Sequence, residues 1–313
     1  MSQTSKIDIV CVGEILIDFI GEQVEQPIKY TKDYHRYLGG SPTNVAMNLS
    51  RLGLAVQMVA TVGEDGFGDY IKKRLEEAEI LTNYLVEHPE KPTTVIFVNR
   101  TQNTPEFIAF RGADTEIHPI QLTEELLKNS KIFHTTCFAL SKKPARNTIL
   151  EGAKKAFELG CQLSIDLNYS EKIWPNQIKA REAIETYCSY EPLVKISQDD
   201  VDRLFGKGLS HEEVFERLHG FGAKVICFTL GSKGAKLSEK GKPVISLSAM
   251  KVEKIMDATG AGDAFWSGFL FAYLKGKSNE KCMEAALQMA AIKLQNVGRI
   301  PDYADVISKV LGI

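Results

Sequence analysis

The chain has 313 residues, of which 44% are hydrophobic and 25% are charged, and its formal net charge is -2. This length and composition are typical of a soluble globular protein with one large α/β domain or two smaller ones. The near-neutral charge argues against binding to nucleic acid or to an anionic membrane surface, and no apolar run reaches the roughly 18 residues of a membrane span.

Strands and helices are predicted to alternate from the N-terminus onward. Residues 7–20 indicate a buried strand followed by a second extended piece, and residues 41–53 indicate a helix that begins near Pro42. The same order continues with strands expected at 55–63, 131–138, 162–168, 192–197 and 224–230, and helices at 67–80, 145–160, 176–190, 198–205 and 210–222. This alternation predicts an α/β fold with a mostly parallel sheet and helices on both faces.

Two segments depart from this order. Roughly residues 16–38 do not continue the alternation, and within residues 91–114 two β-rich runs flank the turn-forming sequence NRTQNTP. We expect a small separate sheet from about residues 16–38 and 90–112, inside one domain that spans residues 1–313. Such a sheet is a natural lid over an active site. The alternative is an edge extension that takes no part in closure.

The cysteines and the N-terminus indicate the cellular compartment in which the protein is expected. The six cysteines form no C-x-x-C pair, and several lie in apolar runs such as KVICFTL. We therefore expect buried, reduced thiols in a cytoplasmic protein. The N-terminus lacks a basic segment and a small-residue cleavage site, so no signal peptide is predicted. The six histidines form no zinc-binding pattern.

The sequence MDATGAGDAFWSGFLFAYL, residues 256–274, places a carboxylate at the start of an apolar helix. Gly260 and Gly262 allow a tight turn and the close approach of a ligand to main-chain N–H groups. The first N–H groups of a helix lack intrahelical partners and favour an anion, so phosphate is the expected guest. Asp263 is then either a carboxylate that stabilises the helix or a general base beside bound phosphate.

A second candidate cluster lies in LGGSPTNVAMNLSRLG and in the strand before it. Gly39 and Gly40 precede a predicted helix, and Asn44 in its first turn offers a donor and an acceptor to a hydroxyl. Asp18 is flanked by apolar residues, so its carboxylate either faces water or binds donors such as sugar hydroxyls. A strand–turn–helix entry without a ligand is the alternative.

A third candidate is FTLGSKGAKL, where a strand is expected to end at Leu230. Gly231 and Gly234 shape a turn before the next strand. The segment is either a simple β-turn or a contact to nucleotide phosphate or ribose at the carboxyl edge of the sheet, where open α/β folds bind ligands.

In this order, these motifs resemble the ribokinase-like (PfkB) family of carbohydrate kinases. Its first signature matches at Gly39, Gly40, Asn44, Ala46, Gly53 and Gly63, and its second at Asp257 and at residues 259–263 and 267–270. The similarity covers nearly the whole chain. It implies a three-layer α/β/α core with a small β-sheet lid, a sugar substrate, and ATP and Mg²⁺ as cofactors. It also raises a monovalent cation as an activator and a homodimer formed through the lid.

The resemblance implies a role for each motif. Asp263 would be the general base, and its N–H group would complete an anion hole with Gly260, Ala261 and Gly262. The sugar site would contain Asp18, Gly39, Gly40, Asn44, Arg111 and Asp166. The ATP site would contain Ser197, Thr229, Gly231 and Gly234, with Asp200 as the metal ligand.

The chain departs from the family pattern at several positions. Ala258 replaces the first Thr of the family pattern D-T-T-G-A-G-D. Ser197-x-x-Asp200 replaces N-x-x-E, which shortens the acid that the family associates with magnesium and phosphate. In DLNYSEKIW, Leu167 and Ser170 stand where the family has Pro and Arg.

The sequence FRGAD, which ends at Asp114, resembles the fructokinase branch, so we expect phosphorylation of a primary hydroxyl of fructose. A 2-keto-3-deoxygluconate kinase is the nearest alternative, and a nucleoside kinase comes third. A different class of function is a non-catalytic sugar-binding regulator on the same fold, against which the retained Asp263 argues.

Overall fold

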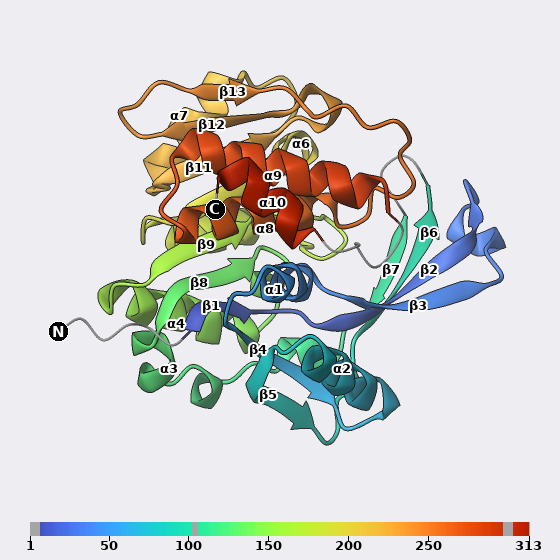
Figure 1. Cartoon of the computed structure of the whole chain (residues 1–313). Coiled ribbons are helices and arrows are strands. Elements are labelled where there is room, and N and C mark those ends of the chain that lie inside the picture. The colour runs from blue at the N-terminus through green and yellow to red at the C-terminus, as the bar shows by residue number, and fades with distance from the viewer. Residues whose placement is uncertain (1–6, 102–105, 297–302, 313) are drawn as a thin grey trace.

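The computed structural model describes residues 7–101, 106–296 and 303–312. Its main body is a nine-stranded sheet between two layers of helices, and a four-stranded sheet projects from one side (Figure 1). The strand order in the large sheet is β13-β12-β11-β10-β9-β8-β1-β4-β5. Every pair from β11 to β5 is parallel, whereas β12 and β13 pair antiparallel. The predicted mostly parallel sheet is therefore confirmed.

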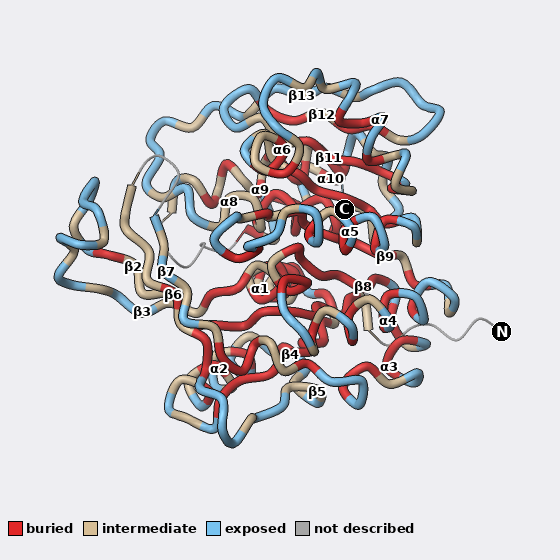
Figure 2. The backbone as a smooth tube through the Cα atoms, turned by 180° about the vertical axis from the view of Figure 1, so that it is seen from behind, coloured by how far each residue is buried: buried red, intermediate tan, exposed pale blue. Residues whose placement is uncertain are grey.

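The strands of the large sheet are β1 (Ile7–Val12), β4 (Val56–Gly63), β5 (Leu81–His88), β8 (Ser130–Thr136), β9 (Gln162–Asp166), β10 (Leu193–Ser197), β11 (Val225–Thr229), β12 (Ala235–Glu239) and β13 (Ile245–Leu247). Most of their residues are buried, as expected for strands covered on both faces (Figure 2). The carboxyl ends of the parallel strands share one edge, which is where ligands bind in open α/β sheets.

Two hydrophobic cores separate the helices into two layers. One core contains α1 (Ser41–Arg51), α2 (Gly66–Glu77), α8 (Ala261–Leu274), α9 (Asn279–Leu294) and α10 (Ala304–Leu311). The other contains α3 (Glu124–Lys128), α4 (Ala145–Glu158), α5 (Gln177–Cys188), α6 (Gln198–Phe205) and α7 (His211–Phe221). The expected three-layer α/β/α core is thus present.

The second sheet has the order β3-β2-β6-β7, with β2 (Leu16–Val24), β3 (Tyr34–Gly39), β6 (Val95–Arg100) and β7 (Phe107–Phe110). It comes from the two segments that break the alternation, and β6 and β7 form the predicted hairpin. The middle of the hairpin turn, residues 102–105, lies outside the described residues. Phe97 stacks on Phe19 with ring centroids 5.0 Å apart. Because side chains alternate along a strand, Phe19 and Asp18 lie on opposite faces.

Several elements are absent from the prediction or have different bounds. Strand β5 is missing from it, because its half-exposed, irregular pattern gives a weak signal. Helices α9 and α10 and strand β13 are missing as well. Strand β11 ends at Thr229, one residue before the expected end at Leu230.

All six cysteines are buried and form no disulfide, as expected. Among the residues that the structure describes, no helix combines the length and the apolar character needed to cross a membrane.

Candidate active site

The site forms where helices α1 and α8 begin. Gly40 precedes α1, and Gly260 precedes α8 in the left-handed conformation with φ 75°. Asp263 lies in the first turn of α8. Its Oδ1 accepts a hydrogen bond of 2.6 Å from the Ser41 hydroxyl, and its Oδ2 accepts one of 2.8 Å from the Asn44 amide. Helix α1 therefore holds both oxygens of the carboxylate, which joins the two glycine motifs in space.

The glycine pair before α1 fits closely against the chain around Asp18. Gly40 has φ 100°, and a Cβ there would lie only 2.3 Å from the backbone carbonyl oxygen of Glu14. A Cβ on Gly39 would lie 2.1 Å from Oδ2 of Asp18. A side chain at position 39 would displace Asp18, and one at position 40 would displace the backbone at Glu14, so this turn requires glycine.

The pKa values of Asp18 and Asp263 are both raised above their ordinary values. Burial, reinforced by the nearby Asp263 carboxylate, raises the pKa of Asp18 to about 7. Burial also raises the pKa of Asp263, although the Ser41 hydrogen bond, the Lys195 charge and the Asn44 hydrogen bond oppose the shift. A carboxylate with a raised pKa accepts a proton more readily near neutral pH, which suits a general base.

Asp166, which is predicted to lie in the sugar site, forms a buried ion pair with Lys195. It ends β9 opposite Lys195 on β10, and Nζ of Lys195 lies 3.0 and 2.8 Å from its two carboxylate oxygens. Burial alone would lower the pKa of Lys195, but the carboxylates of Asp166 and Asp200 raise it above its ordinary value. A Cβ on Gly262 would lie 2.8 Å from the same Nζ, so the ammonium group sits against the G-A-G-D loop.

Ser197 and Asp200 form a capping box at the start of α6. The Asp200 N–H donates to the Ser197 hydroxyl at 3.1 Å, and the Asp200 carboxylate accepts from the Ser197 N–H at 3.2 Å. The other carboxylate oxygen lies 3.7 Å from Arg203. Within the described ranges, no three His, Cys, Asp or Glu side chains gather closely enough to hold a metal ion. A single carboxylate still fits Mg²⁺ bound to ATP, since phosphates and water supply most of its ligands.

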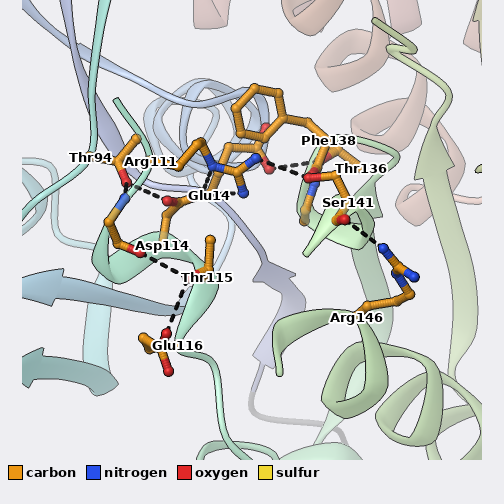
Figure 3. A network of polar contacts seen from close by, with 12 residues as sticks. Glu14, Thr94, Arg111, Asp114, Thr115, Glu116, Thr136, Phe138, Ser141 and Arg146 are labelled. Atoms are coloured by element: carbon orange, nitrogen blue, oxygen red, sulfur yellow. Dashed lines mark hydrogen bonds and ion pairs between the residues drawn. The ribbon is translucent and has the colours of Figure 1, made fainter. Parts of the chain in front are cut away.

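Arg111, also expected in the sugar site, is held by its own neighbours (Figure 3). Its Nε donates to Asp114 at 2.6 Å, and its Nη1 donates to the Ser141 hydroxyl at 2.9 Å. The guanidinium lies 4.2 Å from the ring centroid of Phe138. In this position the positive charge of Arg111 acts on the carboxylate of Glu14. Arg111 does not line the cavity that Asp18 and Asn44 line.

The Glu14 carboxylate accepts a hydrogen bond from the first turn of α1. The donor is the Ser41 backbone N–H, at 3.2 Å. The carboxylate also accepts from the Thr136 hydroxyl at 2.7 Å (Figure 3). The Ser41 N–H belongs to the first turn of α1, where N–H groups lack helical partners. Burial raises the pKa of Glu14 to about 8, while the Thr136 hydrogen bond and the Arg111 charge oppose this shift.

A cavity of about 590 Å³ opens between the small sheet, α1, α2 and the loop before α8. Asp18, Asn44 and Gly260 line it, so it reaches the residues around Asp263. Its wall also carries four cationic side chains, those of Arg51, Arg74, Arg100 and Lys293.

The residues expected to bind ATP lie at the carboxyl edge of the large sheet. Thr229 ends β11 directly opposite Ser197 at the end of β10. A 3₁₀ turn follows at Gly231–Lys233, and Gly234 has φ 98° with no room for a Cβ beside the Leu247 carbonyl. These residues occupy the same edge as Lys195, which fits the general position of ligands in such sheets.

Sequence reasoning missed Ser41, Glu14 and Lys195. Ser41 follows the glycine pair directly, so its place at the helix start was a usable signal. Lys195 stands inside the apolar strand PLVKIS, and a charged residue in a buried strand was a signal as well. Glu14 offered no comparable signal, because its partners come from distant segments.

The model of the pfkB family carbohydrate kinases matches residues 6–305. This chain belongs to the PfkB family of carbohydrate kinases. It is 34% identical over 304 residues to an ATP-dependent 6-phosphofructokinase from Thermoanaerobacterium thermosaccharolyticum, covering 96% of this chain and 92% of that protein. It is 30% identical over 315 residues to a probable fructokinase from Arabidopsis thaliana, covering 96% and 90% of the two chains.

Solved structures agree with this assignment. The fructokinase from Halothermothrix orenii is 32% identical with a TM-score of 0.79, over 94% of this chain and 99% of that one. An uncharacterized sugar kinase from Pyrococcus horikoshii in complex with ATP is 26% identical with a TM-score of 0.82, over 96% and 97%. As a PfkB carbohydrate kinase, the protein is a phosphotransferase that acts on an alcohol group.

Proposed function

We propose that this kinase transfers the γ-phosphate of ATP to a primary hydroxyl of fructose, giving fructose 6-phosphate. The relatives named fructokinase and the ATP-bound sugar kinase support this substrate and this donor. The observation that carries the proposal is Asp263, half-buried at the start of α8 and held by Ser41 and Asn44 beside the cavity that Asp18 lines.

In the proposed reaction, Asp263 takes the proton of the sugar hydroxyl. The freed oxygen forms a bond to the γ-phosphorus while the bond from that phosphorus to the bridging oxygen breaks, and ADP leaves. The N–H groups of Gly262 and Asp263 lie in the first turn of α8 and would bind the phosphoryl oxygens. The N–H of Ala261 instead donates to the Ala258 carbonyl at 3.2 Å, which makes Ala261 the weaker member of the expected anion hole.

Asp18, Gly39, Gly40 and Asn44 would bind the sugar. Asp18 presents a carboxylate acceptor to the cavity, and the glycines bring the backbone close to it. Asn44 holds Asp263 through its amide N–H, which leaves its amide oxygen for a substrate hydroxyl. For the donor, Ser197, Thr229, Gly231 and Gly234 would contact ATP.

Asp200 would hold the Mg²⁺ of MgATP, which neutralises phosphate charge when bound. Activation by a monovalent cation stays a prediction from the family resemblance.

A second candidate acceptor is fructose 6-phosphate. Arg51, Arg74 and Arg100 reach the cavity from α1, α2 and the end of β6, and arginine is well suited to bind phosphate. The relative from Thermoanaerobacterium is named a 6-phosphofructokinase, which favours the same candidate.

Steady-state kinetics with MgATP and a panel of fructose, fructose 6-phosphate, ribose and 2-keto-3-deoxygluconate would test the proposal. A higher kcat/KM for fructose than for the other acceptors supports it. A higher value for fructose 6-phosphate supports the second candidate. Absence of phosphorylation with every sugar would contradict both.

A further inference from the structure

The proposed reaction assigns no role to Lys195, although a lysine is unusual inside a buried strand. It is the third residue of the five-residue strand β10, its side chain is only 7% exposed, and the strand is paired on both sides within the large sheet. A charge at such a position loses its hydration, and its ion pair with Asp166 regains only part of that free energy. Buried ion pairs are therefore weak devices for stability, and a charged pair in a site region indicates function.

The ammonium group of Lys195 points at the loop that begins α8. It lies 2.8 Å from the position that a Cβ on Gly262 would occupy, so glycine at this position leaves room for it. Asp263, one residue further, interacts with the same charge, which opposes the rise in its pKa. Nζ thus approaches the first turn of α8 from the side of the sheet, next to the N–H groups that lack helical partners.

We propose that Lys195 is a catalytic residue whose ammonium group contacts the transferring phosphoryl group and neutralises charge on its oxygens. Asp166 is then a positioning residue that holds Nζ against the loop through its two contacts of 3.0 and 2.8 Å. The proposal rests on the phosphoryl transfer of the family and not on the identity of the sugar. Lys195 takes no proton in this role, because it acts as a fixed positive charge.

The site needs such a charge for an electrostatic reason. Phosphoryl transfer depends on positioning and on neutralisation of the charge spread over the equatorial oxygens. Three carboxylates act on Lys195, the buried Asp166 and Asp200 and the proposed base Asp263, and carboxylates that are not neutralised would repel the phosphates of ATP. Lys195 is the cation that interacts with all three.

A set of three variants separates catalysis from structural support. Lys195→Met removes the charge and keeps much of the side-chain volume, Asp166→Asn removes the partner, and the double variant removes both. Loss of one preorganised donor to a reacting oxyanion costs about 10²–10³ in kcat. We expect kcat to fall by about 10² or more in Lys195→Met and to stay low in the double variant, with the KM for the sugar changed by less than about threefold.

The double variant decides between the two explanations. If Lys195 only compensates the charge of Asp166, then Lys195→Met suffers from an unpaired buried carboxylate, and Asp166→Asn should relieve that defect. A double variant with more than about a third of wild-type kcat would overturn the proposal. This comparison holds even if Lys195→Met alone folds poorly, because the double variant removes both charges of the hydrogen-bonded pair, Lys195 and Asp166.

A second measurement needs no knowledge of the sugar. MgADP with aluminium fluoride mimics the transferring phosphoryl group, and its affinity can be compared with that of MgADP alone by calorimetry. We expect the wild type to bind MgADP more tightly with aluminium fluoride than without it, and the double variant to show no such increase in affinity. The same increase in both proteins would contradict direct contact between Lys195 and the phosphoryl group. Failure of the wild type to phosphorylate any sugar would contradict the proposed substrate and leave this measurement valid.

Discussion

The Ser41 hydroxyl lies 2.6 Å from Oδ1 of Asp263, although the two residues are 222 positions apart in the chain. Each stands in the first turn of its helix, so the contact fixes α1 and α8 relative to each other. It also stabilises the ionised carboxylate and thereby opposes the rise in pKa that burial of Asp263 causes. This contact therefore contributes to both the position and the basicity of the proposed general base.

Ser41→Ala should shift the pH profile of the reaction. The base must be ionised, so activity falls as the pH falls through the pKa of Asp263. Without the hydrogen bond that pKa rises, and the acid limb of kcat/KM moves to higher pH. Loss of a hydrogen bond to a charged group also costs about 1.5–3 kcal/mol, which predicts a decrease of at least about tenfold in kcat/KM. Ser50→Ala is a matched control on α1, since its hydroxyl binds the Ala78 carbonyl far from the site. An unshifted acid limb in Ser41→Ala would contradict the role of this contact.

Asp263→Asn should abolish most turnover while leaving ATP binding nearly unchanged. The substitution keeps the size of the side chain and removes the group that accepts the proton. General-base catalysis typically contributes about 10²–10⁴, so kcat should fall at least that far. Calorimetry with MgATP and a steady-state assay would measure the two quantities. Retention of more than about a tenth of wild-type kcat would contradict the assignment of Asp263 as the base.

The sequence was informative where function imposes a local pattern. Gly40 must adopt a φ of 100°, and Gly260 one of 75°, so glycine marks both helix starts in the sequence itself. Asp263 could be recognised as a carboxylate at a helix start for the same reason, because the glycines and the apolar helix pattern are adjacent to it in the sequence. Alternating strands and helices likewise predicted the parallel sheet, because a buried strand and an amphipathic helix differ in hydrophobic period.

The rest of the site depends on contacts between distant segments. The predicted sugar ligand Asp166 lies directly opposite Lys195 on the neighbouring strand β10. The predicted sugar ligand Arg111 donates from Nε to Asp114 and from Nη1 to Ser141. Neither pairing has a local pattern, because strand register and loop packing decide it.

Sugar binding should slow amide exchange in the small sheet. If β2, β3, β6 and β7 close over the sugar, their backbone hydrogen bonds should open less often in the complex. Hydrogen exchange with and without saturating sugar would test this, with the edge strand β13 on the far side of the large sheet as the control. Equal exchange rates in the small sheet under both conditions would count against a lid.

The outer face of the same sheet should support a homodimer. Phe110 is 59% exposed and Ile108 is 45% exposed, and both lie on the face of Phe97, opposite Asp18. Exposed apolar side chains that cluster on one face indicate an interaction surface. Sedimentation should show a dimer for the wild type and a monomer for Phe110→Ser combined with Ile108→Ser. A wild-type monomer at about 10 μM would refute this prediction.

Fructose should be a better acceptor than 2-keto-3-deoxygluconate. The carboxylate of the acid needs a cation, preferably a bidentate arginine. In the kinases for that acid, the arginine of the family pattern D-x-N-x-R resembles such a partner. Ser170 stands at that position in this chain, and a serine offers only a neutral hydrogen bond. Such a bond is worth about 1 kcal/mol net, against roughly 1.5–3 kcal/mol for a charged one.

Arg111 and Lys172 could supply the cation in place of that arginine, but both already contact other groups of the chain. Arg111 is paired with Asp114, and Lys172 donates to the Phe107 carbonyl at 3.2 Å with its ammonium 5.0 Å from the Phe107 ring centroid. Binding the carboxylate would require breaking these contacts. We therefore expect kcat/KM for fructose to exceed that for the acid by at least about tenfold, or roughly 1.4 kcal/mol of transition-state stabilisation. Ser170→Arg should narrow this difference. A wild-type preference for the acid would mean that the cationic wall of the cavity binds the carboxylate, and the choice of a neutral sugar would be wrong.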